Sequence, residues 1–280
     1  MLYSAPEPID YLVIGHLARD LTPHGPILGG TASYSALTAY ALGLRAGIVT
    51  AMGDDVPVER IAHLPIAGIR AEKSTTFENI TTPAGRVQTV HHLAPLLTPD
   101  LVPDAWRNTP IVHFGPLVHE IDPALFDLFP NAMIGITPQG WLRTWDEHGR
   151  VYPTDWPESG QILSKADAAV ISVEDVGGDE ERIAHMAALV PVFVVTESYN
   201  GARLFHRGSV TRFETLPMKE IDAVGAGDIF AAAFFSQLYR LKDPYEAARF
   251  ATHLAAYSIT RTGLDSVPAP HEIQACLETA

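Results

Sequence analysis

The sequence predicts an α/β fold: a three-layer, doubly wound, mostly parallel sheet with helices on both faces and a small β lid. Three observations support this class. Short apolar runs alternate with helical patterns along most of the 280 residues, an order typical of parallel sheets covered by helices. Two polar stretches interrupt that alternation. A glycine-rich turn from Asp222 to Asp228 leads directly into an apolar helical run, as at many ligand sites in such folds.

Six short runs have the length and apolarity of buried strands: 11–14, 47–50, 111–114, 132–136, 168–171 and 192–196. Helices are expected between them, over 31–42 with a stop at Gly43, in a short segment opened by Asp122-Pro123, and over 179–189. The apolar run 229–235 predicts a buried helix. Asp243-Pro-Tyr-Glu246 has the cap, proline and acidic residue of a helix start, and that helix is expected to reach the region of Thr262 and end at Gly263.

The two polar stretches, 17–28 and 70–92, lack the helical period needed to cover a sheet. The second is rich in Thr, Glu and Arg and contains a Pro-Ala-Gly turn at 83–85, which indicates a hairpin. We expect both to form a small β lid over the strand ends, where open α/β sheets bind ligands. The length suits one large α/β domain or two smaller ones, and we expect residues 1–280 to form a single domain with this lid.

Composition excludes several classes of function. Apolar residues make up 47% and charged residues 19%, which suits a well-packed enzyme. The net charge of −14, with four lysines against fifteen arginines, argues against nucleic acid or an anionic membrane as partner. The single Cys276 rules out an internal disulfide, and Met1 to Asp10 has no basic region of a secretory signal. No apolar run is long enough to span a membrane, so a soluble, cytoplasmic protein is expected.

The turn Gly225-Ala-Gly227 opens a helix whose first amides and positive dipole end would attract an anion, most commonly a phosphate. Asp228 stands in the same turn, where a carboxylate beside phosphate is costly unless it has a function. The obvious function is to take a proton from a hydroxyl that attacks phosphorus. A structural turn remains the alternative. A dinucleotide site is disfavoured because Phe230 replaces the third glycine, and no Gly-Lys-Ser/Thr of a P-loop follows.

Other residues have two readings each. Gly29-Gly30 fits a structural turn before a helix, which the residues alone favour, or a close backbone approach to a ligand. Asp20 is either an exposed loop acid or a carboxylate that binds substrate hydroxyls. Arg143, expected near the carboxyl edge of the sheet, fits a surface ion pair or a phosphate clamp equally. The histidines lack metal-ligand spacing, and there is no G-x-S-x-G elbow, so zinc and nucleophilic hydrolase chemistry are disfavoured.

The segment Asp222-Ala-Val-Gly-Ala-Gly-Asp-Ile-Phe230 resembles the Asp-Thr-x-Gly-Ala-Gly-Asp-x-Phe signature of the ribokinase-like carbohydrate kinases, the PfkB family. Weaker similarities follow in the same order along nearly the whole chain: Gly29-Gly30 with Ala41-Leu-Gly43, Gly53-Asp54, Thr196 with Gly201, and 251–263. Gly-Gly-Thr-Ala-Ser-Tyr34 and Gln-Gly-Trp-Leu-Arg143 look more like the inositol-kinase-like branch.

The resemblance implies transfer of the ATP γ-phosphate to a hydroxyl of a sugar, polyol or nucleoside, with Mg²⁺ on the nucleotide. It implies that Asp228 is the general base and that the amides of Gly225, Ala226 and Gly227 form the anion hole. The implied ligand contacts are Asp20, Gly29, Gly30 and Arg143 for the substrate, and Thr196, Ser198, Gly201, His253 and Gly263 for the nucleotide. It leaves open a monovalent cation near the Gly225 turn and a homodimer through the lid.

The chain also departs from the family pattern. Tyr34 stands where many members have Asn, Ala223 replaces Thr, and Ser198 replaces Gly. The family's Asn-x-x-Glu, associated with magnesium, corresponds to Ser172-Val-Glu-Asp175, whose shorter Ser172 and Asp175 would reach the ion through water. These changes put ribose or fructose specificity in doubt. Two alternatives therefore stay open: a catalytically degenerate sensor or regulator of the same fold, and, more remotely, a Rossmann-type oxidoreductase.

Overall fold

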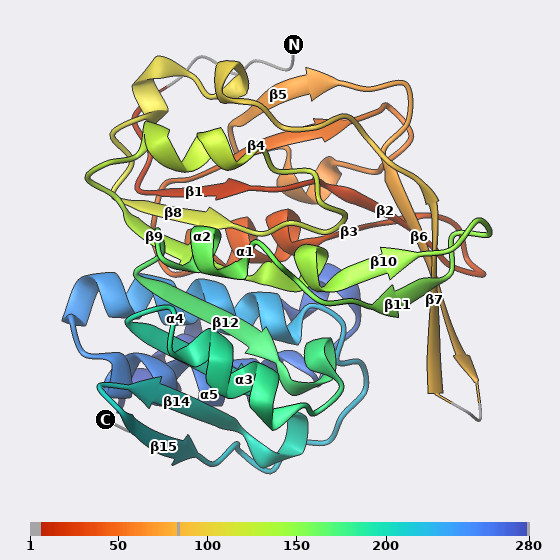
Figure 1. Ribbon diagram of the computed structural model, residues 1–280. Helices are drawn as coiled ribbons and strands as arrows, with labels where there is room; N and C mark the ends of the chain where they lie inside the picture. Colours follow the sequence, from red (N-terminus) through yellow and green to blue (C-terminus); the bar gives the residue numbers. More distant parts are fainter. Residues whose placement is uncertain (1–6, 83–84, 279–280) are drawn as a thin grey trace.

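The computed structural model describes residues 7–82 and 85–278. Within these residues a sheet of nine strands runs through the molecule, with helices on both faces (Figure 1). The strands, in spatial order, are β15 (Ser209–Phe213), β14 (Ala202–His206), β13 (Val192–Thr196), β12 (Ala168–Ser172), β9 (Met133–Ile136), β8 (Ile111–Phe114), β1 (Tyr11–Ile14), β4 (Ala46–Met52) and β5 (Ile66–Arg70). Neighbours from β13 to β5 pair in parallel, and β14 and β15 are antiparallel. The predicted mostly parallel α/β class is confirmed.

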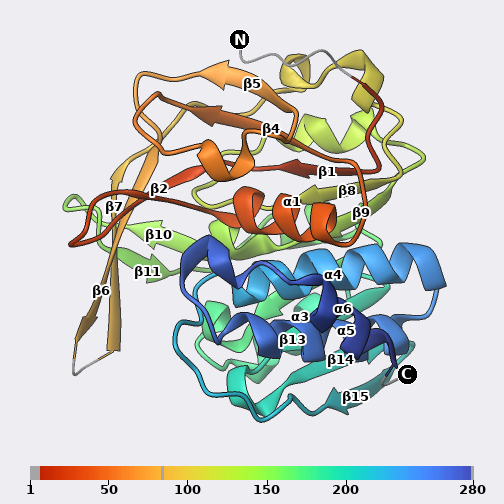
Figure 2. The ribbon, with the colours of Figure 1, turned by 180° about the vertical axis from the view of Figure 1, so that it is seen from behind.

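The two faces of the sheet carry separate hydrophobic cores because side chains alternate along each strand. In β1, Tyr11 and Val13 contribute to one core, and Leu12 and Ile14 contribute to the other. Figure 2 shows four helices in front of the first face: α1 (Thr31–Ala41), α4 (Ala226–Leu241), α5 (Pro244–Ser258) and α6 (Pro270–Glu278). The opposite face carries α2 (Ser159–Leu163) and α3 (Glu180–Ala187). Both faces are covered, so the strands are apolar on both sides, as the sequence runs predict.

Helix α4 is buried over most of its length, in agreement with the apolar run that predicts it. It begins after Gly225, which adopts the left-handed conformation at φ 81°. Residues 229–238 are buried, and Phe235 packs onto the backbone of β9, where a Cβ on Gly135 would lie 2.7 Å from the phenyl ring. The apolar packing of this helix therefore holds its first turn firmly at the edge of the sheet.

Most predicted elements occur where the sequence places them, but one boundary is wrong. The helix that Asp243 caps through the amides of Tyr245 and Glu246 ends at Ser258, short of Thr262. Gly263 instead begins the 3₁₀ helix η8 (Gly263–Ser266). Strands β5, β14 and β15 were not predicted, because polar residues within them or at their ends break the apolar pattern. Residues 1–6, 83–84 and 279–280 lie outside the described residues, and with them most of the turn predicted at 83–85.

A second, smaller sheet is formed by segments 17–28 and 70–92. Its strands, in spatial order, are β3 (Ile27–Gly29), β2 (Ala18–Leu21), β6 (Thr75–Thr82) and β7 (Gly85–His92). Two antiparallel hairpins, β2–β3 and β6–β7, are joined by parallel pairing of β2 with β6. This sheet projects from the edge of the main sheet (Figure 1), and we call it the lid. A short hairpin of β10 (Arg143–Trp145) and β11 (Val151–Pro153) touches it through the bridge Thr89–Arg150.

The remaining short helices are 3₁₀ turns: η1 (Glu59–Ile61), η2 (Pro99–Leu101), η3 (Asp104–Trp106), η4 (Pro123–Leu128), η5 (Pro138–Leu142), η6 (Val173–Val176) and η7 (Ser198–Asn200). Among the described helices, none combines the length and apolarity required to cross a bilayer.

Candidate active site

A cavity of about 540 Å³ lies where the carboxyl ends of β9, β12 and β13 meet the first turns of α1 and α4. Lid residues line one end of it, and residues of α5 line the other. Carboxyl ends of parallel strands meet at one edge of a sheet, which is why open α/β sheets bind ligands there. The glycine-rich turn lines this cavity too; we call the part lined by lid residues the polar compartment and the part lined by α5 and residues 216–218 the apolar compartment.

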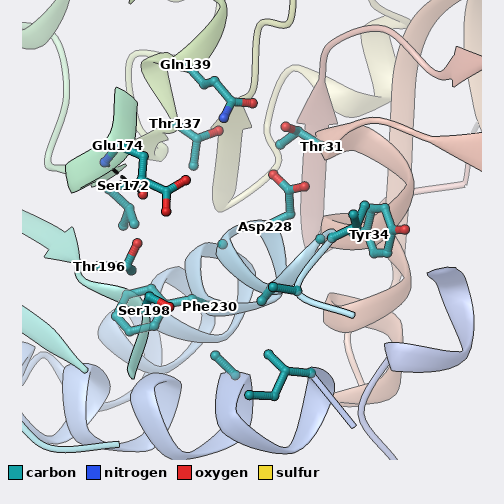
Figure 3. A pocket seen from close by; sticks show the side chains of 18 of the residues that line it. Thr31, Tyr34, Thr137, Gln139, Ser172, Glu174, Thr196, Ser198, Asp228 and Phe230 are labelled. Atoms are coloured by element: carbon teal, nitrogen blue, oxygen red, sulfur yellow. Dashed lines mark hydrogen bonds between the residues drawn. The ribbon is translucent and has the colours of Figure 1, made fainter. Parts of the chain in front are cut away.

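The first turn of α4 lines the cavity, and the Asp228 carboxylate points into it (Figure 3). Among the described residues, the amides of Gly225 and Gly227 have no hydrogen-bond acceptor, whereas Ala226 N donates to Ala223 O at 3.2 Å. Gly225 and Gly227 therefore offer the free donors that an anion would need, and the Ala226 amide, expected to join them, is already engaged in the turn.

Burial raises the pKa of Asp228 from 3.8 to about 6. The Thr31 hydroxyl donates a hydrogen bond to this carboxylate, and the Arg143 charge also favours the ionised form, so both lower the pKa. The charges of Asp175 and Asp20 act in the opposite direction. Asp228 is consequently ionised at neutral pH but close to its titration range, which is the state required of a general base.

The lid-side compartment contains the predicted substrate residues Asp20, Gly30 and Arg143. Gly30 is the N-cap of α1 at φ 87°, a conformation that favours glycine. Gly29 does not line the cavity; a Cβ there would overlap the Asp20 carboxylate. Because Gly29 has no side chain, the Asp20 carboxylate can occupy this space.

The lid adds residues that the sequence reasoning did not identify. Phe77 and Asn79 of β6 and Gln88 of β7 line the compartment, together with Leu117 from the loop after β8. Gln88 Nε2 donates to Asn79 Oδ1 at 2.9 Å. Phe77 and Asn79 are two residues apart and so share one face of the strand, a period that could have revealed them. Amides beside an apolar ring suit a molecule with hydroxyl groups and an apolar carbon face.

The opposite compartment contains Thr196, Ser198 and Gly201, which the resemblance assigns to the nucleotide. Apolar residues from two segments distant in sequence also line it, namely Leu216, Pro217, Met218, Ala255, Ala256 and Ile259, with the polar Thr215, Glu220 and Thr252 beside them. Sequence reasoning missed the 216–218 stretch because it has no regular structure. His253 and Gly263, also predicted here, are not among the lining residues; Gly263 N donates to Asp222 Oδ2 instead.

The predicted magnesium residues Ser172 and Asp175 form the cap of η6. Ser172 Oγ accepts from Glu174 N at 3.2 Å, and Asp175 Oδ2 accepts from Ser172 N at 2.8 Å. Asp175 Oδ1 also accepts from Gln139 Nε2 at 3.0 Å. The neighbouring Glu174, missed from the sequence, lines the cavity too, and its carboxylate points toward its interior in Figure 3. Mg²⁺ usually takes one or two protein carboxylates besides phosphate oxygens and water, so this donor set fits it.

Tyr34, which departs from the family's Asn, packs its ring against the glycine-rich turn. A Cβ on Gly225 would overlap this ring, so both the backbone angle and the neighbour require glycine there. Figure 3 shows the Tyr34 hydroxyl pointing away from Asp228. Burial raises the pKa of this hydroxyl from 10.0, so it is neutral at physiological pH. Tyr34 therefore shapes the turn and does not act on Asp228 directly.

Residues 162–272 match the model of the pfkB family carbohydrate kinases. The cytidine kinase of Thermococcus kodakarensis is 22% identical over 91% of this chain and 98% of its own length. A pyrophosphate-dependent kinase of the ribokinase family, complexed with a pyrophosphate analogue and myo-inositol, superposes with a TM-score of 0.79 at 17% identity, covering 95% of this chain and 99% of that one. The ribokinase of Arabidopsis thaliana, complexed with ribose and ATP, superposes with a TM-score of 0.70 at 16% identity, over 98% and 100%.

The two solved structures show that the chain has the ribokinase fold over 95% or more of its length. The match to the family model includes the Gly225–Asp228 turn and α5, the elements that surround the centre of the cavity. The ribokinase fold of the chain and the match of residues 162–272 to the pfkB family model make the protein similar to the ribokinase-like carbohydrate kinases, which are phosphotransferases with an alcohol group as acceptor.

Proposed function

We propose that the protein transfers the γ-phosphate of ATP to a hydroxyl of a small sugar, polyol or nucleoside. One observation carries the proposal. Asp228 and the two free amides of Gly225 and Gly227 belong to one helix turn, placed between a polar and an apolar compartment of a single cavity. A hydroxylated acceptor on one side and a nucleotide on the other would meet at this turn.

Asp228 is the proposed general base. Its carboxylate would accept the proton of the attacking hydroxyl as the oxygen approaches the γ-phosphorus in line with the leaving diphosphate. The proton then resides on Asp228 until solvent removes it. Because the acceptor oxygen attacks the phosphorus directly, no phosphoenzyme is formed. The raised pKa of about 6 makes the Asp228 carboxylate a stronger base than an ordinary aspartate and leaves it ionised at pH 7.

The free amides of Gly225 and Gly227 are the proposed anion hole. Both residues line the cavity at a helix N-terminus, where the dipole would add to the attraction of their amides for the charge on the transferred phosphoryl oxygens. The Arg143 guanidinium lies near enough to lower the Asp228 pKa, so its charge also acts on this region. Such local donors are needed because the chain as a whole is acidic.

The apolar compartment supports a nucleotide as donor. Leu216, Pro217 and Met218 line the same cavity as Ala255, Ala256 and Ile259, and an inorganic diphosphate has no apolar group to bury against them. The Arabidopsis ribokinase binds ATP, whereas the kinase complexed with myo-inositol depends on pyrophosphate. The apolar lining of this chain favours ATP, because burying a base against it yields hydrophobic free energy.

Magnesium, held by the nucleotide phosphates and by Glu174 and Asp175, would neutralise charge on the donor phosphates. The remaining chemistry belongs to the protein's own groups. Closure of the lid would exclude water, which otherwise competes with the acceptor hydroxyl.

The acceptor compartment supports a polyhydroxylated molecule. Asp20 can accept hydrogen bonds from two neighbouring hydroxyls, and the Asn79–Gln88 pair supplies amide donors and acceptors beside Phe77. The relatives act on or bind cytidine, ribose and myo-inositol, which share vicinal hydroxyl groups. We therefore include sugars, inositol-like polyols and nucleosides as candidate acceptors.

A ligand-binding sensor without kinase activity is the second candidate. It is favoured by the engagement of both Asp175 oxygens, with Ser172 N and Gln139 Nε2, which leaves this carboxylate less free for magnesium. The free amides and the ionised Asp228 argue for catalysis.

A coupled ADP-release screen over sugars, polyols and nucleosides with Mg·ATP tests the proposal, with phosphate release from pyrophosphate as a parallel arm. We expect acceptor-dependent turnover with ATP that Asp228→Asn reduces by about 10²–10⁴-fold while the protein stays folded. Turnover with pyrophosphate alone would refute the assigned donor. Acceptor-induced thermal shifts without phosphoryl transfer by any donor would favour the sensor.

A further inference from the structure

A buried row of three hydrogen-bonding side chains runs under the cavity from β1 to the end of β9. Tyr11 Oη lies 3.1 Å from His113 Nδ1, and His113 Nε2 lies 2.9 Å from Thr137 Oγ1. Tyr11 and His113 are fully buried, and Thr137 is 8% exposed and lines the cavity. The His113 ring is held edge-on against Phe235 of α4, with 5.0 Å between ring centroids. The row therefore has a fixed geometry and one end at the active site.

The protonation states of the row follow from its burial. Desolvation lowers the pKa of His113 from 6.5 to about 3, so the imidazole is neutral and carries one N–H. Burial, with the Asp228 charge, raises the pKa of Tyr11 well above 10, so the phenol keeps its proton. One ring nitrogen of His113 must therefore donate and the other must accept.

Hydrogen-bond satisfaction selects one tautomer. Among the described residues, His113 is the only hydrogen-bond partner of the Tyr11 hydroxyl. If Nδ1 carried the proton, the Tyr11 hydroxyl would accept that hydrogen bond and its own buried hydrogen would have no acceptor, which is costly. If Nε2 carries the proton, Tyr11 donates to Nδ1, Nε2 donates to Thr137 Oγ1, and every group in the row is paired.

The direction of these hydrogen bonds determines whether the Thr137 hydroxyl can act as a donor in the cavity. Its oxygen accepts from His113, so its hydroxyl hydrogen is available to an oxygen in the cavity. Thr137 and Thr31 flank Gly115: a Cβ on Gly115 would lie 2.5 Å from Thr31 Cγ2 and 3.3 Å from Thr137 Oγ1. Figure 3 shows both threonines on the side of the cavity toward which the Asp228 carboxylate points. Thr31 donates a hydrogen bond to that carboxylate, and Thr137 lines the cavity beside it.

We propose that Thr137, oriented by the Tyr11–His113 pair, donates a hydrogen bond to an oxygen of the transferred γ-phosphoryl group. The inference rests on the proposed kinase function and adds a third donor to the amides of Gly225 and Gly227. Thr137 is the contact residue, and His113 and Tyr11 are positioning residues that keep its hydroxyl from turning back as a donor into the core.

The tautomer is tested by imidazole ¹⁵N NMR, which does not depend on activity. We expect His113, assigned by the loss of its signals in His113→Gln, to show a protonated Nε2 and an unprotonated Nδ1, unchanged between about pH 5.5 and 8.5. A protonated Nδ1, or a ring that titrates in this range, would overturn the proposal.

The contact is tested by calorimetric titration with Mg·adenylyl imidodiphosphate, which has a γ-phosphate, and with Mg·ADP, which lacks one. Thr137→Val should weaken binding of the imidodiphosphate about 10–100-fold without affecting ADP, and Thr137→Ser should restore it. Thr38→Val is the matched control, because Thr38 is buried in α1 away from the cavity.

Equal affinities of wild type and Thr137→Val for adenylyl imidodiphosphate would contradict this inference while leaving the proposed function intact. Parallel weakening of both nucleotides in Thr137→Val would also overturn it, since that indicates a structural role. A wild-type protein that binds neither nucleotide would overturn the proposed function together with the inference.

Discussion

The carboxylate of Asp20 occupies the space in which any other residue at position 29 would carry its side chain. A Cβ built on Gly29 would overlap Oδ2 of Asp20 and lie 2.7 Å from its Cγ. The contact arises from the antiparallel β2–β3 hairpin, in which Ala18 is paired with Gly29. The double glycine thus acts in two ways: Gly29 accommodates the carboxylate, and Gly30 turns the chain into α1.

We expect Gly29→Ala to displace Asp20 and weaken acceptor binding. Loss of a hydrogen bond to a charged group corresponds to an increase in acceptor KM of about 10–100-fold, with a much smaller effect on the KM for ATP. Steady-state kinetics with the acceptor found in the screen measure this. Gly160→Ala is the matched control, because a Cβ there has no neighbour within 4 Å. An unchanged acceptor KM in Gly29→Ala would contradict the role of Asp20.

The two glycines of the catalytic turn should respond differently to substitution. Gly225 has φ 81° and contacts the Tyr34 ring, so Gly225→Ala should lower the free energy of unfolding by about 1–3 kcal/mol. Gly227 has open space around its Cα, so Gly227→Val should fold with near-normal stability. It should still reduce kcat by about 10²–10³-fold, because the side chain blocks the amide from the phosphoryl group. Urea denaturation and kinetics separate these effects; near-normal turnover in Gly227→Val would refute the anion hole.

Activity should decline as the pH falls through about 6. The base form of Asp228 is required, and burial raises its pKa to about 6, so protonation below this value removes the proton acceptor. The logarithm of kcat/KM against pH should then have unit slope on the acid side. Circular dichroism at each pH controls for unfolding. A profile that stays flat to pH 5 would show that Asp228 is not the titrating base.

The same shift predicts a pH-dependent gain in stability for Asp228→Asn. Because the folded-state pKa is higher than the unfolded value, the ionised carboxylate destabilises the native protein. The variant should therefore be more stable than wild type above pH 6, by at most about 3 kcal/mol. The difference should shrink as the pH falls from about 6 to 4, where both states become protonated. Denaturant titrations of both proteins at several pH values measure it. Equal stabilities at pH 8 would contradict the burial of this charge.

Filling the apolar compartment should affect the nucleotide alone. Ala255→Trp adds bulk among the residues proposed to hold the base, and we expect the KM for ATP to rise at least about 10-fold. The acceptor KM should change little, because the polar compartment lies on the other side of the catalytic turn. Thermal unfolding checks that α5 tolerates the change. If the KM for ATP is unaffected in the folded variant, the base does not bind there.

Local sequence features allowed much of the fold to be predicted. The strands at 11–14, 111–114 and 192–196 are recognised from their apolar runs alone, and their bounds agree with the structure. Strand β14 was missed because Arg203, its second residue, breaks the apolar run, and this charge is buried through ion pairs with Glu180 and Glu197. Such partners lie elsewhere in the sequence, and no local pattern identifies them.

The glycine-rich turn and its carboxylate could be found by sequence reasoning because their chemistry is local: two glycines, a helix start and Asp228 are neighbours in the chain. The tertiary structure alone decided what surrounds them. It brought Thr31, Arg143 and Asp20 near Asp228, and it engaged the Ala226 amide within the turn. It placed residues 216–218, and not the predicted His253, along the apolar compartment. It also buried His113 between Tyr11 and Thr137. The pKa of a carboxylate and the tautomer of an imidazole depend on solvent exclusion and on partners distant in sequence, so only the folded chain determines them.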